Sequence, residues 1–338
     1  MFVSNENDGS KDLGAPSDMR SLKRIAIGDT SIHVEVMVYR EDTGTRQPLV
    51  IVNSIDLPMP PSSAFCEQMW NAGYQVIFVR RPGFGNTANL PPVLLESQEV
   101  KSLAPLGAET AVLKILIETM NLKNIVLMGM GTSNSICLRV AQLSTEVEFS
   151  IYANPLFHPA IWEVVRPAWL RRMIRQTLLS KSGLKIGVRG LRAVLRRDPI
   201  WFYKQFAQKS FGDVAYVCDN LADFRQAGIL LQNYSPELMY YELQTALIED
   251  TRWPSKATRN SNAVILSGTE TTKNWKRKIT AEAKRLGLPI VFAPSGDLFV
   301  AYASADVLCR ILDDRRPGRE GQVANSQDQV QTLPRSRH

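Results

Sequence analysis

The chain contains few of the residues that build metal centres, disulfide frameworks and histidine-based active sites. Its 338 residues include only four cysteines and three histidines. The cysteines lie far apart, at Cys66, Cys137, Cys218 and Cys309. No two of them have the close spacing of a zinc or redox motif. We therefore predict reduced, mostly buried thiols, no bound metal and no cofactor.

Long apolar runs and a leader-like beginning are also missing. No stretch of about 18 apolar residues occurs, so no membrane span is expected. Residues 1–8 are polar and acidic, without the basic head and apolar stretch of a secretory signal peptide. These absences predict a cytoplasmic protein. Hydrophobic residues make up 44% of the chain and charged residues 22%, which is typical of globular proteins.

One segment lacks acidic residues altogether. Between Val164 and Arg197 there is no Asp or Glu, although Arg and Lys recur throughout. At helical spacing, an apolar stripe is formed by Leu184, Val188, Leu191 and Leu195, and the basic stripe beside it by Lys185, Arg189, Arg192 and Arg196. Such a helix can bind an acidic protein partner or an anionic membrane surface, or it can simply face water while its apolar side covers the core. No nucleic-acid-binding motif accompanies it, so no specific nucleic acid is predicted as a partner.

Strands and helices alternate along most of the chain. The predicted strands are 24–27, 31–39, 49–52, 74–79, 125–128, 149–152, 263–266 and 289–292. The predicted helices are 65–72, 109–120, 135–143, 276–286 and 303–312. The first two strands form a hairpin. The later alternation predicts an α/β protein with a mostly parallel central sheet and helices on both faces.

Composition divides the chain into a core, an insertion and two tails. Residues 1–20 and 315–338 have few apolar side chains and are predicted to be disordered. The α/β core is predicted to comprise residues 21–155 and 260–314. Residues 156–259 form a helical insertion within it.

Several local patterns, in their order along the chain, resemble the α/β-hydrolase superfamily. The strand 74–79 leads into the loop sequence RPGFG at 81–85. The strand 125–128 runs into GMGTS at 129–133, which resembles the nucleophile elbow G-x-S-x-G. The sequence PSGD at 294–297 resembles the loop that carries the catalytic histidine. The resemblance implies an α/β-hydrolase fold in which residues 156–259 are the cap.

The positions that the resemblance assigns to catalysis depart from the family pattern. The nucleophile position holds Gly131, the histidine position holds Asp297, and Glu270 is the only carboxylate near the acid position. The oxyanion loop, usually His-Gly, reads Asn53-Ser54. A serine hydrolase needs a base within hydrogen-bond reach of its nucleophile. The resemblance therefore implies a degenerate catalytic triad.

Two side chains are candidates for an alternative chemistry. Ser133 lies just past the elbow, where a serine more often caps the helix or bonds to the backbone. His158 is the one histidine placed to line a pocket, since His33 lies on the peripheral hairpin and His338 in a tail. An atypical hydrolase of ester or acyl substrates would use Ser133 or His158.

The leading hypothesis is a non-catalytic protein that binds a small apolar or acyl-like ligand, or a protein partner. The family includes such members, among them plant hormone receptors and N-myc downstream-regulated proteins. The residues predicted to line the ligand pocket are Asn53, Ser54, Met130, Gly131, Thr132, His158, Asp297 and Phe299. A further hypothesis is a regulatory or assembly subunit that docks through the basic cap surface.

Overall fold

The computed structural model describes most of the predicted core and more than half of the predicted cap. The described residues are 20–27, 32–42, 44–55, 57–85, 87, 90, 106–155, 169, 172, 176, 180–240 and 262–315. The predicted tails, apart from Arg20 and Arg315, and the candidate residue His158 lie outside them.

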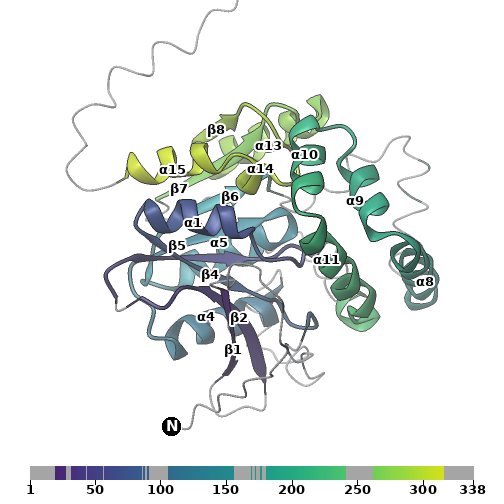
Figure 1. Ribbon diagram of the computed structural model, residues 1–338, viewed down its shortest axis with the longest axis horizontal. Helices are drawn as coiled ribbons and strands as arrows, with labels where there is room; N and C mark the ends of the chain where they lie inside the picture. Colours follow the sequence, from purple (N-terminus) through teal and green to yellow (C-terminus); the bar gives the residue numbers. More distant parts are fainter. Residues whose placement is uncertain are drawn as a thin grey trace, which may run out of the picture.

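The core is one 8-stranded sheet in the order β1-β2-β4-β3-β5-β6-β7-β8 (Figure 1). Its strands are β1 (Arg20–Ala26), β2 (His33–Tyr39), β3 (Gln47–Val52), β4 (Tyr74–Val79), β5 (Ile125–Met130), β6 (Val147–Ala153), β7 (Ala263–Gly268) and β8 (Ile290–Ala293). Strand β2 pairs antiparallel with β1 and with β4. All further pairs, from β4–β3 to β7–β8, are parallel. The predicted hairpin and mostly parallel sheet are therefore confirmed.

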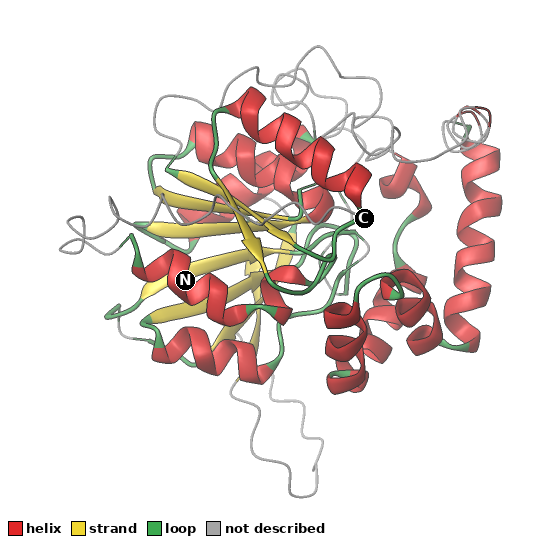
Figure 2. Cartoon of the chain, turned by 90° about the horizontal axis from the view of Figure 1, so that it is seen from above, coloured by secondary structure: helices red, strands yellow, loops and turns green. Residues whose placement is uncertain are grey.

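Helices cover both faces of the sheet (Figure 2). The core helices are α1 (Ser63–Asn71), α4 (Gly107–Thr119), α5 (Asn134–Leu143), α13 (Lys273–Leu286), α14 (Val300–Ala303) and α15 (Ala305–Asp313). Buried side chains of α4, α5 and α13 belong to one core cluster, and those of α1, α14 and α15 to the other. Alternate residues of a strand reach opposite faces, so Val50 enters the first cluster and Ile51 the second.

Between β6 and β7 the chain forms the helical insertion, a name used here for α8 (Lys181–Arg197), α9 (Pro199–Ala207), α10 (Phe211–Asp219) and α11 (Leu221–Asn233). Three of these helices begin at a side-chain cap, from Ser180, Asp198 and Ser210. Both ribbon views place the insertion on one side of the molecule, with α8 outermost (Figures 1 and 2). Among the described helices, none has the length and apolar character needed to cross a bilayer.

The structure corrects several predicted boundaries. The predicted helix 303–312 is α15, which begins after Ser304, and the short helix α14 that precedes it was not predicted. Strand β5 runs two residues beyond the predicted end, to Met130. Arg20 was placed in the N-terminal tail, yet it is the first residue of β1 because its backbone pairs with Tyr39. Arg315 was placed in the C-terminal tail, yet its guanidinium lies over the Phe149 ring.

Candidate functional site

The turn after β5 is the centre of the candidate site. Strand β5 ends at Met130, and Gly131 begins a short 3-10 turn, η1 (Gly131–Ser133), that leads into α5. Gly131 has a φ of +51°, in the left-handed region that glycine adopts most readily. Strand β5 is buried along its whole length, to Met130, which is 1% exposed. The sequence therefore builds a tight strand-to-helix turn whose apex has no side chain.

Ser133 serves as an internal brace of this turn. Its Oγ accepts from the Met130 N–H at 2.9 Å. The same oxygen lies 2.8 Å from the Val52 carbonyl and 2.9 Å from the Met130 carbonyl, which are the acceptors for its proton. The side chain is completely buried. Each of these partners is a backbone group, so the hydroxyl ties β5 to the end of β3.

Two backbone N–H groups, one in this turn and one in the loop after β3, donate to side-chain hydroxyls. The Thr132 N–H donates to Ser54 Oγ at 3.2 Å, and the Ile55 N–H donates to Thr132 Oγ1 at 3.3 Å. The two hydroxyl oxygens lie 3.1 Å apart. In an α/β hydrolase the corresponding N–H groups, after the nucleophile and in the loop after the third strand, bind the substrate oxyanion. Here the Ser54 hydroxyl holds the Thr132 N–H, and the Thr132 hydroxyl holds the Ile55 N–H.

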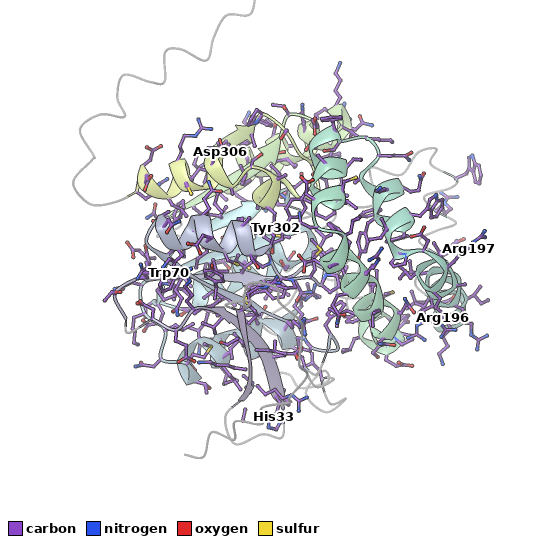
Figure 3. All side chains as sticks on the ribbon, in the orientation of Figure 1. His33, Trp70, Arg196, Arg197, Tyr302 and Asp306 are labelled. Carbon is purple, nitrogen blue, oxygen red and sulfur yellow. The ribbon has the colours of Figure 1, made fainter. Side chains whose placement is uncertain are left out.

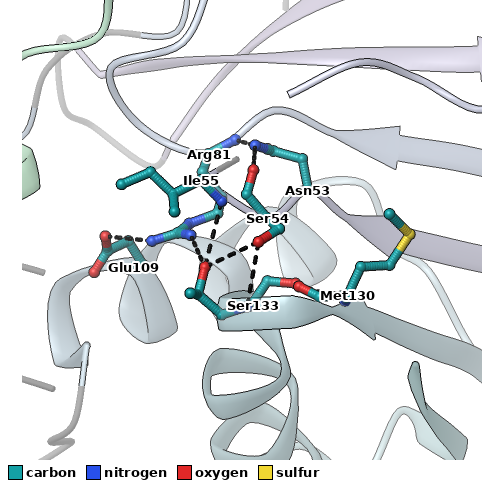
Figure 4. Close-up of polar contacts among 8 residues, drawn as sticks. Asn53, Ser54, Ile55, Arg81, Glu109, Met130 and Ser133 are labelled. Atoms are coloured by element: carbon teal, nitrogen blue, oxygen red, sulfur yellow. Dashed lines mark hydrogen bonds and ion pairs between the residues drawn. The ribbon is translucent and has the colours of Figure 1, made fainter. Parts of the chain in front are cut away.

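A buried ion pair supports the same hydroxyls (Figure 4). Arg81 donates from Nη1 to Thr132 Oγ1 at 3.3 Å, and its Nη2 lies 3.2 Å from Glu109 Oε1. The side chains of Arg81 and Glu109 are 2% and 4% exposed. Asn53 completes the contact by accepting from the Arg81 N–H at 2.7 Å. We call this group of Asn53, Ser54, Arg81, Glu109 and Thr132 the elbow joint.

The predicted apolar pocket residues lie in a packed cluster. Met130 and Phe299 are 1% and 0% exposed and belong to the same core cluster as aromatic side chains of the insertion. The Phe299 ring lies 5.1 Å from Phe224 of α11 and 5.8 Å from Tyr216 of α10, between ring centroids. Tyr203 of α9 adds a contact to Phe224 at 5.0 Å. Aromatic packing thus joins the insertion to the core at Phe299, the residue before α14.

Asp297 follows β8 and faces two other loops. Its Oδ1 accepts from Asn154 Nδ2 at 2.9 Å and from Thr271 Oγ1 at 2.8 Å. Burial raises the pKa of Asp297, while the hydrogen bonds from Thr271 and Asn154 lower it, and the net shift is upward. The structure therefore places this residue among neutral donors that link the loops after β6, β7 and β8.

Glu270 binds the insertion to the core. Its Oε2 accepts from Ser210 Oγ at 2.7 Å, from the Gly212 N–H at 2.9 Å and from the Gly296 N–H at 2.8 Å. Burial raises the pKa of Glu270, but the hydrogen bonds from Ser210, Gly212 and Gly296 outweigh it, so the pKa is lowered. The carboxylate sits at the N-terminus of α10, where the helix dipole favours negative charge.

Asp213 of α10 makes the reciprocal contact. Its carboxylate accepts from the N–H groups of Asp297 at 2.9 Å, Leu298 at 2.7 Å and Phe299 at 3.2 Å. Asp213 is fully buried, and this burial raises its pKa to about 6 despite the three donors. We call Asp213, Glu270 and Asp297 the loop clamp. Asp213 thereby accepts from the N–H groups just ahead of α14.

Glycines allow the clamp to close. A Cβ on Gly268 would lie 1.6 Å from the Gly296 carbonyl oxygen, and one on Gly212 would lie 2.8 Å from the Gly296 nitrogen. Both distances are far inside van der Waals contact. The loops after β7 and β8 and the start of α10 therefore approach as closely as bare backbone permits.

Comparisons with known proteins identify the fold. No protein-family model and no curated protein matches the sequence. The structure is similar to the Cif epoxide hydrolase from Acinetobacter nosocomialis, with a TM-score of 0.62 and 12% identity over 89% of this chain and 90% of that one. It is also similar to a bromoperoxidase from Bacillus anthracis, with a TM-score of 0.52 and 18% identity over 87% of this chain and 100% of that one.

The chain has the α/β-hydrolase fold. An α/β hydrolase from a deep-sea metagenome library agrees, with a TM-score of 0.53 and 14% identity over 84% of this chain and 94% of that one. In this fold the nucleophile stands on the strand-to-helix turn of G-x-S-x-G. The corresponding turn, after β5, holds Gly131.

Sequence reasoning did not place Arg81 or Glu109 in the elbow joint, or Asp213 in the loop clamp. Glu109 carried a signal, because its spacing places it on the same apolar stripe as Val112, Leu113 and Leu116 of α4. Asp213 follows Ser210 in the Ser-x-x-Asp pattern of a helix start, but that pattern gives no long-range partner. Among the described residues, no three His, Cys, Asp or Glu side chains are grouped to hold a metal. Burial raises the pKa of the Cys137 thiol, which keeps it neutral.

The predicted basic surface lies on α8 and is only partly free. Lys185, Arg189 and Arg196 are exposed. Arg192 is half-buried, and its Nη2 donates to the Tyr234 carbonyl at 3.0 Å. Arg192 therefore fastens α8 to the end of α11, and the other three side chains make up the exposed part of the predicted stripe.

Proposed function

We propose that this protein is a non-catalytic protein of the α/β-hydrolase fold that acts by binding, with its elbow closed and its insertion fixed as a binding element. The observation that carries the proposal is the bond from the Thr132 N–H to Ser54 Oγ. That donor is the group that would stabilise a substrate oxyanion, and its removal from an active enzyme costs several kcal/mol of transition-state stabilisation.

The surroundings of the elbow support the same reading. Gly131 supplies no nucleophile. Ser133, the nearest serine in sequence, is completely buried and braced by backbone groups of Val52 and Met130. Attack by a serine requires a neighbouring base, and the position assigned to the histidine holds Asp297. These features favour a structural role for the elbow over hydrolysis.

A partner at the surface of the insertion is favoured over a small apolar ligand at the elbow. Met130 and Phe299, which would line such a pocket, are buried in aromatic packing. The loop clamp, by contrast, holds α10 firmly on the core. Here the loops that carry catalytic groups in α/β hydrolases fix the insertion instead. The insertion therefore presents a rigid outer surface, which suits recognition of a partner.

Activity-based labelling tests the absence of catalysis. Purified protein is incubated with a fluorophosphonate probe and assayed on short- and medium-chain esters, beside an active serine hydrolase. We expect no labelling and no turnover above buffer. Labelling that maps to Ser133 and disappears in Ser133→Ala would refute the proposal. Turnover that is lost in His158→Ala, with folding unchanged, would identify the atypical hydrolase instead.

A further inference from the structure

The outer surface of α8 divides into a side that carries cations and a side that carries small or apolar residues. The inner side is buried through Leu184, Val188 and Leu195, which fixes the rotation of the helix. Successive residues turn by about 100° around a helix. This angle places Lys185, Arg189 and Arg196 together on one outer side. Ile186, Gly190 and Val194 fall on the other, with Arg197 beside Ile186.

The cations of α8 have no anionic counterpart on the described protein. None of Lys185, Arg189, Arg196 and Arg197 forms an ion pair with a described residue. The acidic residue that follows, Asp198, accepts from the Trp201 N–H at 2.8 Å as the cap of α9. In the stick view, Arg196 and Arg197 lie at the outer edge of the molecule, away from the sheet (Figure 3). This edge carries a concentrated positive charge.

The apolar side of α8 is open. The side chain of Ile186 is 69% exposed and that of Val194 is 38% exposed. A Cβ added to Gly187 or to Gly190 would meet no atom within 4 Å. Apolar side chains therefore stand clear of the rest of the protein, beside the cations.

From this geometry we propose that α8 docks the protein on an anionic phospholipid bilayer. The helix of 17 residues is about 25 Å long and would lie along the membrane plane. Lys185, Arg189 and Arg196 would contact lipid phosphates, while Ile186 and Val194 enter the boundary between headgroups and acyl chains. This inference deepens the proposed function by naming the partner of the insertion, and it rests on the insertion being the binding element.

The exposed groups suit a bilayer better than an acidic protein. A stable protein interface buries about 800 Å² on each partner around an apolar core. Ile186 and Val194, separated by Gly187 and Gly190 on one convex helix, are too few for such a core. A bilayer requires no shape complementarity, and each basic side chain near an anionic surface contributes independently.

Vesicle flotation with the full chain tests the proposal. We expect binding to phosphatidylcholine vesicles that contain phosphatidylserine, none to pure phosphatidylcholine, and release by high salt. The variant Lys185→Gln/Arg189→Gln/Arg196→Gln should bind about a hundredfold more weakly. The matched variant Lys273→Gln/Arg277→Gln/Lys284→Gln removes the same charge from exposed residues of α13 and should bind nearly as the native protein does.

A second pair of variants tests the apolar contribution. Ile186→Gln should weaken vesicle binding several-fold, because an aliphatic side chain that would enter the bilayer is lost. Ile229→Gln on α11, where the isoleucine is 49% exposed, should change binding little.

Three outcomes would overturn the docking proposal: no flotation with anionic vesicles, equal losses in the α8 and α13 variants, or retention on a polyglutamate resin without vesicle binding. The last outcome would favour an acidic protein. None of them bears on catalysis, which probe labelling measures separately.

Discussion

The elbow joint and the loop clamp both satisfy buried N–H groups at the carboxyl ends of parallel strands, but with different acceptors. In the elbow joint the hydroxyls of Ser54 and Thr132 accept from N–H groups inside the core. In the loop clamp the carboxylates of Asp213 and Glu270 accept across the boundary between core and insertion. Both regions occupy loops that carry catalytic groups in α/β hydrolases.

The difference shows how each region holds its position. A hydroxyl bears no charge, so its burial costs little once it is bonded and its bonds do not depend on pH. A carboxylate makes stronger bonds to N–H groups but resists burial, which is why the pKa of Asp213 rises to about 6. The hydroxyl bonds of the elbow joint should therefore be insensitive to pH, whereas the loop clamp should respond to it.

The largest effect is expected from forcing the clamp open with a side chain. Gly268→Ala should lower the free energy of unfolding by about 3 kcal/mol or more, because its Cβ would overlap the Gly296 backbone. Urea unfolding measures the change. Gly187→Ala, in the open part of α8, should instead raise stability by up to about 1 kcal/mol. Equal stability of native protein and Gly268→Ala would contradict the close approach.

The response of the clamp to pH isolates Asp213. Its folded pKa of about 6 exceeds the unfolded value of 3.8, so its contribution to stability is complete below pH 3.8 and is lost as the pH rises through 6. Between those limits, the stability of the native protein relative to Asp213→Asn should fall by up to about 3 kcal/mol. Urea unfolding across this range checks the trend, and Asp219→Asn, an exposed site on the same helix, is the control. A stability difference between the native protein and Asp213→Asn that does not change with pH would refute this prediction.

Opening the elbow joint should have a smaller, pH-independent effect. Ser54→Ala removes the acceptor of the Thr132 N–H and should cost about 2 kcal/mol of unfolding free energy. Measured at several pH values, Ser54→Ala should run parallel to the native protein. A pH-dependent loss would mean that the contact between Ser54 and Thr132 depends on ionisation of the Arg81–Glu109 pair, and the comparison of the two regions would fail.

The smallest effect concerns the elbow apex. Gly131→Ala should cost about 1 kcal/mol, because an alanine at a φ of +51° is strained. Thermal unfolding measures this loss, and Gly187→Ala again provides the helical control. A gain in stability at position 131 would show that the apex relaxes out of the left-handed region.

The sequence by itself determined the elements and their order. Short apolar runs and helical apolar spacing are local features of the sequence, so the predicted strands 49–52 and 125–128 and the predicted helix 276–286 lie within observed elements. The expectation that Ser133 bonds to the backbone also followed from local chemistry, because a helix start offers nearby groups. The helix α14 was missed because its four residues are too few to show a helical apolar period.

Tertiary structure alone decided which groups meet. Thr132 contacts Ser54 across 78 positions of the chain, and Asp213 contacts Leu298 across 85. No local pattern specifies such partners, because they depend on how the parallel strands align and how the insertion returns to the sheet. The closure of the elbow and the anchoring of the insertion are therefore consequences of the packed fold. The absence of a serine at position 131, by contrast, follows directly from the sequence.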